Sequence, residues 1–231
     1  MNVAIIVAGG KGLRFGGNRP KQFLELNGSP LIIHTLRQFE RSQEIGRLVV
    51  VVPAEETAGF QYLAKEYGLK KVSHVVSGGG TRAQSVRCGL ETIDRADIVA
   101  VHDGVRPLVA PEDIDQVVRT AADRGAAILV APVEDTIKQV ENDRVSRTWP
   151  RANLRRALTP QCFRFEILKR AYENLSEIEA QGIELTDDSM LIERLGIEIF
   201  AVEASTRNIK ITTKADLAVA EVLLKSVVSC R

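Results

Sequence analysis

The stretch NVAIIVAGGKGLR, residues 2–14, is the segment from which the fold can be predicted. It begins with a short apolar run rich in β-branched residues and passes directly into glycines. Such a run is typical of a buried parallel strand that ends in a tight loop. Glycine has no Cβ, so the backbone N–H groups of this loop can approach a phosphate closely.

Spacing excludes two common nucleotide-binding loops. The dinucleotide fingerprint needs a third glycine where Phe15 stands, and a P-loop needs Ser or Thr directly after its lysine, where Gly12 follows Lys11. The glycines alone indicate only a tight turn with solvated cations. Because Arg14 and Lys21 lie in the same short loop, we favour a phosphate site.

Strand-like and helix-like segments alternate after this loop. Apolar runs at 48–52, 72–76, 98–101 and 127–130 predict strands, and helical patterns lie at about 31–39, 55–67, 81–93 and 111–124. This βαβ repetition predicts a single α/β domain over residues 1–231, with a mostly parallel sheet and helices on both faces.

The alternation is interrupted after Pro132. Residues 136–140 and 144–148 alternate apolar with polar side chains around Glu141-Asn142-Asp143, which predicts a β-hairpin. A lone hairpin is marginally stable in water, so we expect this arm, at about 133–155, to pack on something such as a second subunit. Helices near 163–175, 187–195 and from Thr213, and strands at 197–202 and 209–211, are expected to follow.

Composition restricts the class of protein. The net charge of +1 favours neither nucleic acid nor a membrane as partner. Three cysteines without a C-x-x-C pair fit a reducing compartment. The chain starts directly on a strand-like run and has no long apolar segment, so we expect a cytoplasmic protein.

Two further clusters follow predicted strands. In the first, Arg82 and Ser85 lie in the first turn of a helix behind Gly78-Gly79-Gly80, where they could face a nucleotide or form only a flexible, capped loop. In the second, Asp103 leaves a strand and could hold Mg²⁺ or a substrate hydroxyl, or pair only with Arg106.

For the histidines and for the acidic pair at 187–188, we expect structural roles and not catalytic ones. His102 is expected to be packed or hydrogen-bonded, and the three histidines show no metal-ligand spacing. The pair Asp187-Asp188 is expected to cap a helix.

Taken in order, these motifs resemble the 2-C-methyl-D-erythritol 4-phosphate cytidylyltransferases. The resemblance covers essentially the whole chain and rests on these segments: Ala8–Arg14, Pro20-Lys21-Gln22, Gly79–Val86, His102–Pro107, Pro132–Lys138, Thr159-Pro160-Gln161, Thr186-Asp187-Asp188 and Asn208-Ile209-Lys210. It implies a Rossmann-like sheet with a protruding β-arm, a homodimer joined by that arm, and a need for Mg²⁺.

The resemblance also implies roles for individual residues. Catalytic charge on the triphosphate would come from Arg14, Lys21 and Lys210. The nucleotide would be bound by Ala8, Gly9, Gly10, Gly12, Gly79, Arg82 and Ser85. Methylerythritol phosphate would be held by Asp103, Arg106, Thr136, Arg151 and Thr159, with Asp103 also a candidate ligand for Mg²⁺ together with the CTP phosphates.

The expected activity is transfer of CMP from CTP to methylerythritol phosphate, with release of pyrophosphate. A ribitol 5-phosphate cytidylyltransferase is the nearest alternative, and a non-catalytic nucleotide-binding domain is a distant one. A nicotinamide-dependent oxidoreductase is disfavoured by the missing glycine. The acceptor phosphate has a second pKa of about 6, so it is already a dianion at neutral pH and needs no general base.

Overall fold

The computed structural model describes residues 1–10 and 20–228. Its centre is a seven-stranded sheet in the order β11-β7-β10-β6-β1-β4-β5. Strand β10 runs antiparallel to its neighbours β6 and β7, and the other pairings are parallel. The strands are β1 (Asn2–Val7), β4 (Ile45–Val52), β5 (Val72–Ser77), β6 (Ile98–Asp103), β7 (Ala126–Pro132), β10 (Arg155–Arg164) and β11 (Phe200–Glu203).

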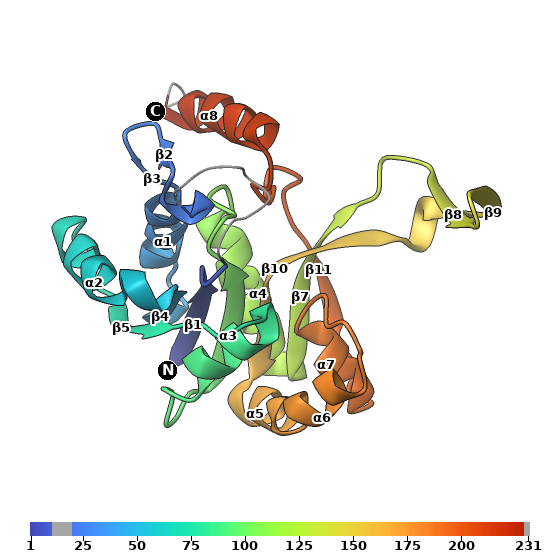
Figure 1. The fold of residues 1–231 in the computed structure, drawn as a ribbon, viewed down its shortest axis with the longest axis horizontal. Helices are drawn as coiled ribbons and strands as arrows, with labels where there is room; N and C mark the ends of the chain where they lie inside the picture. The colour runs from blue at the N-terminus through green and yellow to red at the C-terminus, as the bar shows by residue number, and fades with distance from the viewer. Residues whose placement is uncertain (11–19, 229–231) are drawn as a thin grey trace.

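Helices cover both faces of the sheet, as the alternation predicted (Figure 1). Side chains of consecutive strand residues point to opposite faces, so an apolar run can be buried on both sides. On one face lie α1 (Leu31–Arg41), α2 (Thr57–Glu66) and α4 (Pro111–Arg124). On the other lie α3 (Arg82–Leu90), α5 (Phe165–Glu173), α6 (Leu175–Ala180) and α7 (Ser189–Arg194).

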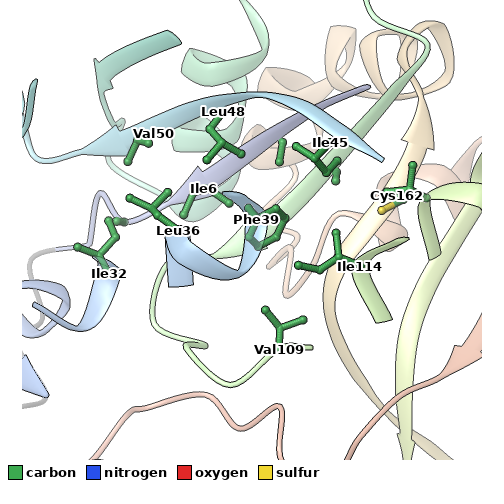
Figure 2. Packing of buried hydrophobic residues seen from close by; sticks show 14 of the residues in the cluster. Ile6, Ile32, Leu36, Phe39, Ile45, Leu48, Val50, Val109, Ile114 and Cys162 are labelled. Atoms are coloured by element: carbon green, nitrogen blue, oxygen red, sulfur yellow. The ribbon is translucent and has the colours of Figure 1, made fainter. Parts of the chain in front are cut away.

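The core on the α1 face shows how this layering works. Ile6, Leu48 and Val50 of the sheet pack against Leu36 and Phe39 of α1 (Figure 2). All five side chains are fully buried. Burial of a large apolar side chain contributes roughly 1.5–3 kcal/mol, so this contact fixes α1 firmly against the strands.

The order of the strands creates a crevice at the carboxyl ends of β1 and β6. From β1 the chain continues to β4 and β5 on one side, and then returns to β6 on the other side of β1. Ligands of open α/β sheets bind where the strand order reverses in this way. Residues 8–10, which follow β1, and Asp103, which ends β6, both lie at this point of the fold.

Most helix ends agree with their sequence signals. Gly68 and Gly125 adopt positive φ angles of 65° and 98° behind α2 and α4, a conformation that glycine adopts readily. Helix α8 (Lys214–Val228) begins with a reciprocal pair: Asp216 accepts from the N–H of Thr213, and Thr213 Oγ1 accepts from the N–H of Asp216. None of the described helices is long and apolar enough to cross a lipid bilayer.

The hairpin was predicted correctly and extends away from the rest of the chain (Figure 1). Among the strands of residues 1–10 and 20–228, β8 (Ile137–Glu141) and β9 (Arg144–Trp149) pair only with each other. Asn142 and Asp143 form the turn with φ angles of 49° and 61°, as two-residue hairpin turns require. Every residue of both strands is exposed in the single chain.

Two parts of the sheet differ from expectation. The ten-residue strand β10 was missed because Pro160 lies in it, and proline usually argues against a central strand. The strand tolerates it at an irregularity, where the register against β7 shifts between Ala157 and Gln161. The strand expected at residues 209–211 was wrong, since that segment forms none. Five short elements complete the described part of the chain: η2 (Lys21–Phe23), β2 (Glu25–Leu26), β3 (Ser29–Pro30), η3 (Ala54–Glu56) and η4 (Arg151–Asn153).

Candidate active site

Strand β6 positions two functional side chains on opposite faces of the sheet. Ala100 faces the α1 layer and Val101 faces the α3 layer, so alternation places His102 toward α1 and Asp103 toward α3. The ring of His102 accordingly packs against Phe39, with 4.9 Å between ring centroids. Asp103 is therefore turned toward the first residue of α3, Arg82.

Three cations surround the carboxylate of Asp103. Arg82 Nε lies 3.2 Å from Oδ1, and both Arg106 Nε (3.1 Å) and Lys210 Nζ (3.0 Å) lie near Oδ2. Burial by itself would raise the pKa of Asp103, but attraction to Arg82, Lys210 and Arg106 outweighs it and holds the pKa well below its usual range. The carboxylate thus stays ionised and gathers positive charge at one point.

A cleft of about 230 Å³ opens at this cluster. Five of the residues that the sequence assigned to substrate, nucleotide or catalysis lie in its wall: Arg82, Asp103, Arg106, Thr159 and Lys210. Its remaining lining is Ala157, Leu158, Gln161, Thr186 and Asp187. Residues far apart in the sequence thus form one polar, cation-rich hollow.

Arg82 also forms an ion pair with the buried carboxylate of Asp188. Its Nη2 lies 2.8 Å from Asp188 Oδ2, and the hydroxyl of Tyr172 donates to Asp188 Oδ1 at 2.5 Å. The side chain of Asp188 is fully buried, so losing its charged partner would be costly. Burial alone would lower the pKa of Arg82, but Asp188 and Asp103 raise it overall. Asp188 therefore fixes the direction from which Arg82 approaches Asp103.

The capping interpretation of the acidic pair is right for one member only. Asp187 Oδ1 accepts from the N–H of Met190 at 3.1 Å and from Ser189 Oγ, and so caps α7. Asp188 makes no side-chain cap hydrogen bond. It pairs with Arg82 instead.

The described residues proposed for the nucleotide follow β1 and β5, two strands that β4 separates in the sheet. A Cβ on Gly9 would lie 3.3 Å from Cα of Gly78, so the loops after β1 and β5 touch. Ser85 Oγ binds within the second loop, donating to Thr81 O at 2.9 Å and accepting from the N–H of Gly79 at 3.2 Å. A Cβ on Gly79 would come within 2.5 Å of Cβ of Gln84, so this loop requires glycine there.

The first loop is supported by Gln22. Its amide donates to the carbonyls of Ala8 at 2.6 Å and Gly10 at 3.0 Å. Lys21 begins the single turn η2 directly beside it. The predicted residues Gly12 and Arg14 lie outside the described residues.

The structure does not bring Thr136 and Arg151 to the cleft. Both are exposed at the base of the arm, and Arg151 Nη1 donates to the carbonyl of Glu134. Neither lines the cavity.

Thr159 is fixed in place by hydrogen bonds from three sides. Its hydroxyl contacts His102 Nδ1 at 2.9 Å and accepts from the N–H of Asp103 at 3.2 Å. Its carbonyl accepts from Asn208 Nδ2 at 2.8 Å, while the carbonyl of Asn208 accepts from Arg106 Nη1 at 3.0 Å. The segment around Asn208 therefore positions both sides of the cleft.

The cleft does not fit a resident metal ion. Among residues 1–10 and 20–228, no group of three or more His, Cys, Asp or Glu side chains could hold one. Both oxygens of Asp103 are already paired with cations. Mg²⁺ is usually held by one or two carboxylates together with substrate phosphates, so any such ion has to bring its remaining ligands with it.

Sequence reasoning missed the buried supports of the site. Tyr172, Asp188 and Asn208 are close to their partners only in the folded chain. The sequence did point to two of these residues, because Asp188 lies in the motif at 186–188 and Asn208 in the motif at 208–210. Their spacing did not indicate that Arg82 and Thr159 are their partners.

Comparison with known proteins gives a consistent picture. Residues 2–226 match the family model described as "IspD: 2-C-methyl-D-erythritol 4-phosphate cytidylyltransferase". A curated protein of that name from Bacillus velezensis is 42% identical over 225 residues, covering 97% of this chain and 96% of that protein. One from Shouchella clausii is 41% identical and covers 96% of each.

Solved structures agree in fold over the same span. The 2-C-methyl-D-erythritol 4-phosphate cytidylyltransferase of Francisella tularensis superposes with a TM-score of 0.78 at 33% identity, covering 95% of this chain and 97% of that one. The 4-diphosphocytidyl-2C-methyl-D-erythritol synthase of Anaerococcus prevotii gives a TM-score of 0.83 at 28% identity, covering 97% and 98%.

Proposed function

The chain belongs to the IspD family of 2-C-methyl-D-erythritol 4-phosphate cytidylyltransferases, and we propose that the cleft at Asp103 holds the methylerythritol phosphate. As a member of this family it is a cytidylyltransferase of the non-mevalonate route to isoprenoid precursors. The observation that carries the proposal is the gathering of Arg82, Arg106 and Lys210 around one buried carboxylate. This arrangement offers acceptors for hydroxyl groups and cations for a phosphate within one hollow.

CTP is proposed to lie along the loops after β1 and β5. Gly9, Gly10 and Gly79 leave backbone N–H groups close to the ligand, and the N-terminus of α3 adds its dipole. Lys21 and Lys210 would neutralise the triphosphate from two sides, with Arg14 as a third cation. The acceptor phosphate then lies beside the α-phosphate of CTP.

This geometry needs no protein base. The acceptor phosphate dianion attacks the α-phosphorus of CTP, a new P–O bond forms, and the bond to the bridging oxygen breaks to release pyrophosphate. Phosphoryl transfer requires chiefly positioning and neutralisation of charge from the protein. His102 is wholly buried, and this burial lowers its pKa to about 3, so it has no role in proton transfer at neutral pH.

Mg²⁺ is proposed to enter as the magnesium complex of CTP. In that form the phosphates supply ligands that the described residues lack.

Substrate choice provides the first test. The expected result is that pyrophosphate release is at least about fivefold faster with CTP than with ATP or GTP, because each unpaired buried polar group costs about 1–3 kcal/mol. Methylerythritol 4-phosphate should likewise exceed ribitol 5-phosphate. The measurement is coupled pyrophosphate release at matched concentrations, and equal rates with ATP would contradict the placement of the base.

We further propose a homodimer joined through the arm. Four large apolar side chains on it are exposed in the single chain: Ile137, Val140, Val145 and Trp149. Val140 and Val145 face each other across the hairpin, as do Ile137 and Trp149. Exposed apolar clusters of this kind mark interaction surfaces. A second copy would cover them and could carry Thr136 and Arg151 to the neighbouring cleft.

Removal of the arm tests this assembly. Replacing residues 137–149 by a short Gly-Ser turn should give a monomer by light scattering. It should raise KM for methylerythritol phosphate about tenfold, the effect of roughly 1.4 kcal/mol of lost contacts, with little change in KM for CTP. Tyr62→Ser, which alters an even more exposed large side chain on α2, should stay dimeric. A fully active monomer would overturn the proposal.

Residence in the cytoplasm is also a proposal. Cys88 and Cys162 carry free thiols, and burial raises the pKa of the Cys162 thiol well above its usual value. Unpaired thiols are common in reducing compartments. The free thiols of Cys88 and Cys162 therefore support a cytoplasmic location.

A further inference from the structure

The hydrogen bonds of His102 determine which of its nitrogens carries the proton. Nε2 lies 3.3 Å from the carbonyl oxygen of Arg106. A carbonyl can only accept, so Nε2 must be protonated. The ring is wholly buried, with Phe39 packed against it and Thr159 at Nδ1, and burial disfavours a charged imidazolium. The ring is therefore neutral, and Nδ1 is an acceptor.

The tautomer of His102 in turn sets the direction of the Thr159 hydroxyl. Nδ1 lies 2.9 Å from Thr159 Oγ1, so the hydroxyl must donate its proton to the ring. The same oxygen accepts the N–H of Asp103 at 3.2 Å. A hydroxyl has one proton and two lone pairs, which leaves Thr159 with one lone pair and no donor.

We propose that His102 is a positioning residue that makes Thr159 an acceptor only, so that Thr159 recognises a hydroxyl of the polyol and not its phosphate. Thr159 lines the cleft beside Asp103, whose ionised carboxylate is also an acceptor only. Two neighbouring acceptors suit a substrate that presents hydroxyl donors. The phosphate is left to Arg82, Arg106 and Lys210. This inference rests on the proposed placement of the polyol phosphate in the cleft.

The tautomer can be measured directly without substrate. In protein labelled with ¹⁵N-histidine, the NMR signals of His102 are identified by their loss in His102→Phe, which keeps a ring against Phe39. The expected result is an Nε2–H tautomer that does not titrate between pH 5 and 8. An Nδ1–H tautomer, or protonation in that range, would overturn the role of His102 even if the cleft binds the polyol.

A coupling experiment tests the hydroxyl contact. Thr159→Val should raise KM for methylerythritol phosphate about fivefold to tenfold, as expected for one hydrogen bond, and leave KM for CTP within about twofold. With one of the deoxy analogues that each lack a single hydroxyl, wild type and Thr159→Val should have equal KM. Thr159→Ser, which keeps the hydroxyl, should still discriminate against that analogue.

Two outcomes would contradict the hydroxyl contact in different ways. An equal loss in Thr159→Val with every deoxy analogue would show that Thr159 does not recognise a hydroxyl. An unchanged KM for methylerythritol phosphate, with the Nε2–H tautomer intact, would overturn the placement of the polyol itself. Folded His102→Phe should lose discrimination against the same analogue. If that variant does not fold, the His102 signals in the wild-type spectrum can be assigned by removing those of His34 and His74 through substitution. The wild-type tautomer and the kinetics of the Thr159 variants then still test the proposal.

Discussion

Replacing Lys210 with methionine is expected to lower the catalytic rate by about 100- to 1000-fold, the usual effect of losing one well-placed electrostatic donor. Lys210 Nζ lies 3.0 Å from the Asp103 carboxylate and lines the cleft in which we propose that the two anionic substrates meet. Its charge is most valuable in the transition state, so the rate should fall more than CTP binding weakens. Lys21→Ala should behave in the same way.

The measurement is the pair of kcat and KM for each variant, by pyrophosphate release. Lys65→Ala removes an exposed lysine from α2 and serves as the control, with both constants expected to match wild type. Circular dichroism should show Lys210→Met and Lys21→Ala to be folded. An unchanged kcat with only a higher KM for CTP would mean that these lysines are anchors for the nucleotide and not catalysts.

The layered fold could be predicted from local patterns because its central strands are apolar on both faces and glycines follow α2 and α4. Gly68 and Gly125 show this most clearly. Strand β10 could not be predicted from local patterns, because Pro160 lies in it and because it pairs antiparallel with β6 and β7 in an otherwise parallel sheet. Such a strand depends on tertiary pairing that no local rule reports.

The candidate site could be predicted where its residues follow strand ends. Asp103 and Gly79 lie at or just after strand ends, as predicted, and the carboxyl ends of parallel strands meet at one edge of the sheet. The partners of these residues depend on which face a side chain occupies and on contacts across the chain. The pairing of Arg82 with Asp188 joins residues 106 positions apart, and no spacing rule could have indicated it.

The pH dependence of the rate is the second large effect. If the acceptor dianion is the nucleophile, kcat/KM should fall about tenfold per unit below the second phosphate pKa of about 6, and so about a hundredfold by pH 4. Asp103 does not cause this decline. Its pKa is depressed, so the stability it contributes is present above about pH 4 and is lost only as pH falls through its lower folded value.

His102 acts on stability in the same range and requires a control. Burial lowers its pKa to about 3, whereas in the unfolded chain it is about 6.5. The unfolded state therefore binds the proton first, and folding stability declines as pH falls from about 6.5 toward 3. Circular dichroism at each pH, with rates taken only where the protein is folded, separates this effect from the chemistry.

The most direct test of the mechanism is to compare the pH–rate profiles of two acceptors at the same CTP concentration. One is methylerythritol 4-phosphate, and the other is its phosphonate analogue, in which CH₂ replaces the ester oxygen and raises the second pKa. The CTP tail titrates identically in both experiments, so any displacement belongs to the acceptor. Without a protein base, the acid limb should move to higher pH with the phosphonate by the difference between the two acceptors' pKa values. An acid limb at the same pH for both acceptors would show that a group other than the acceptor, on the protein or on CTP, controls the reaction, and would contradict the account.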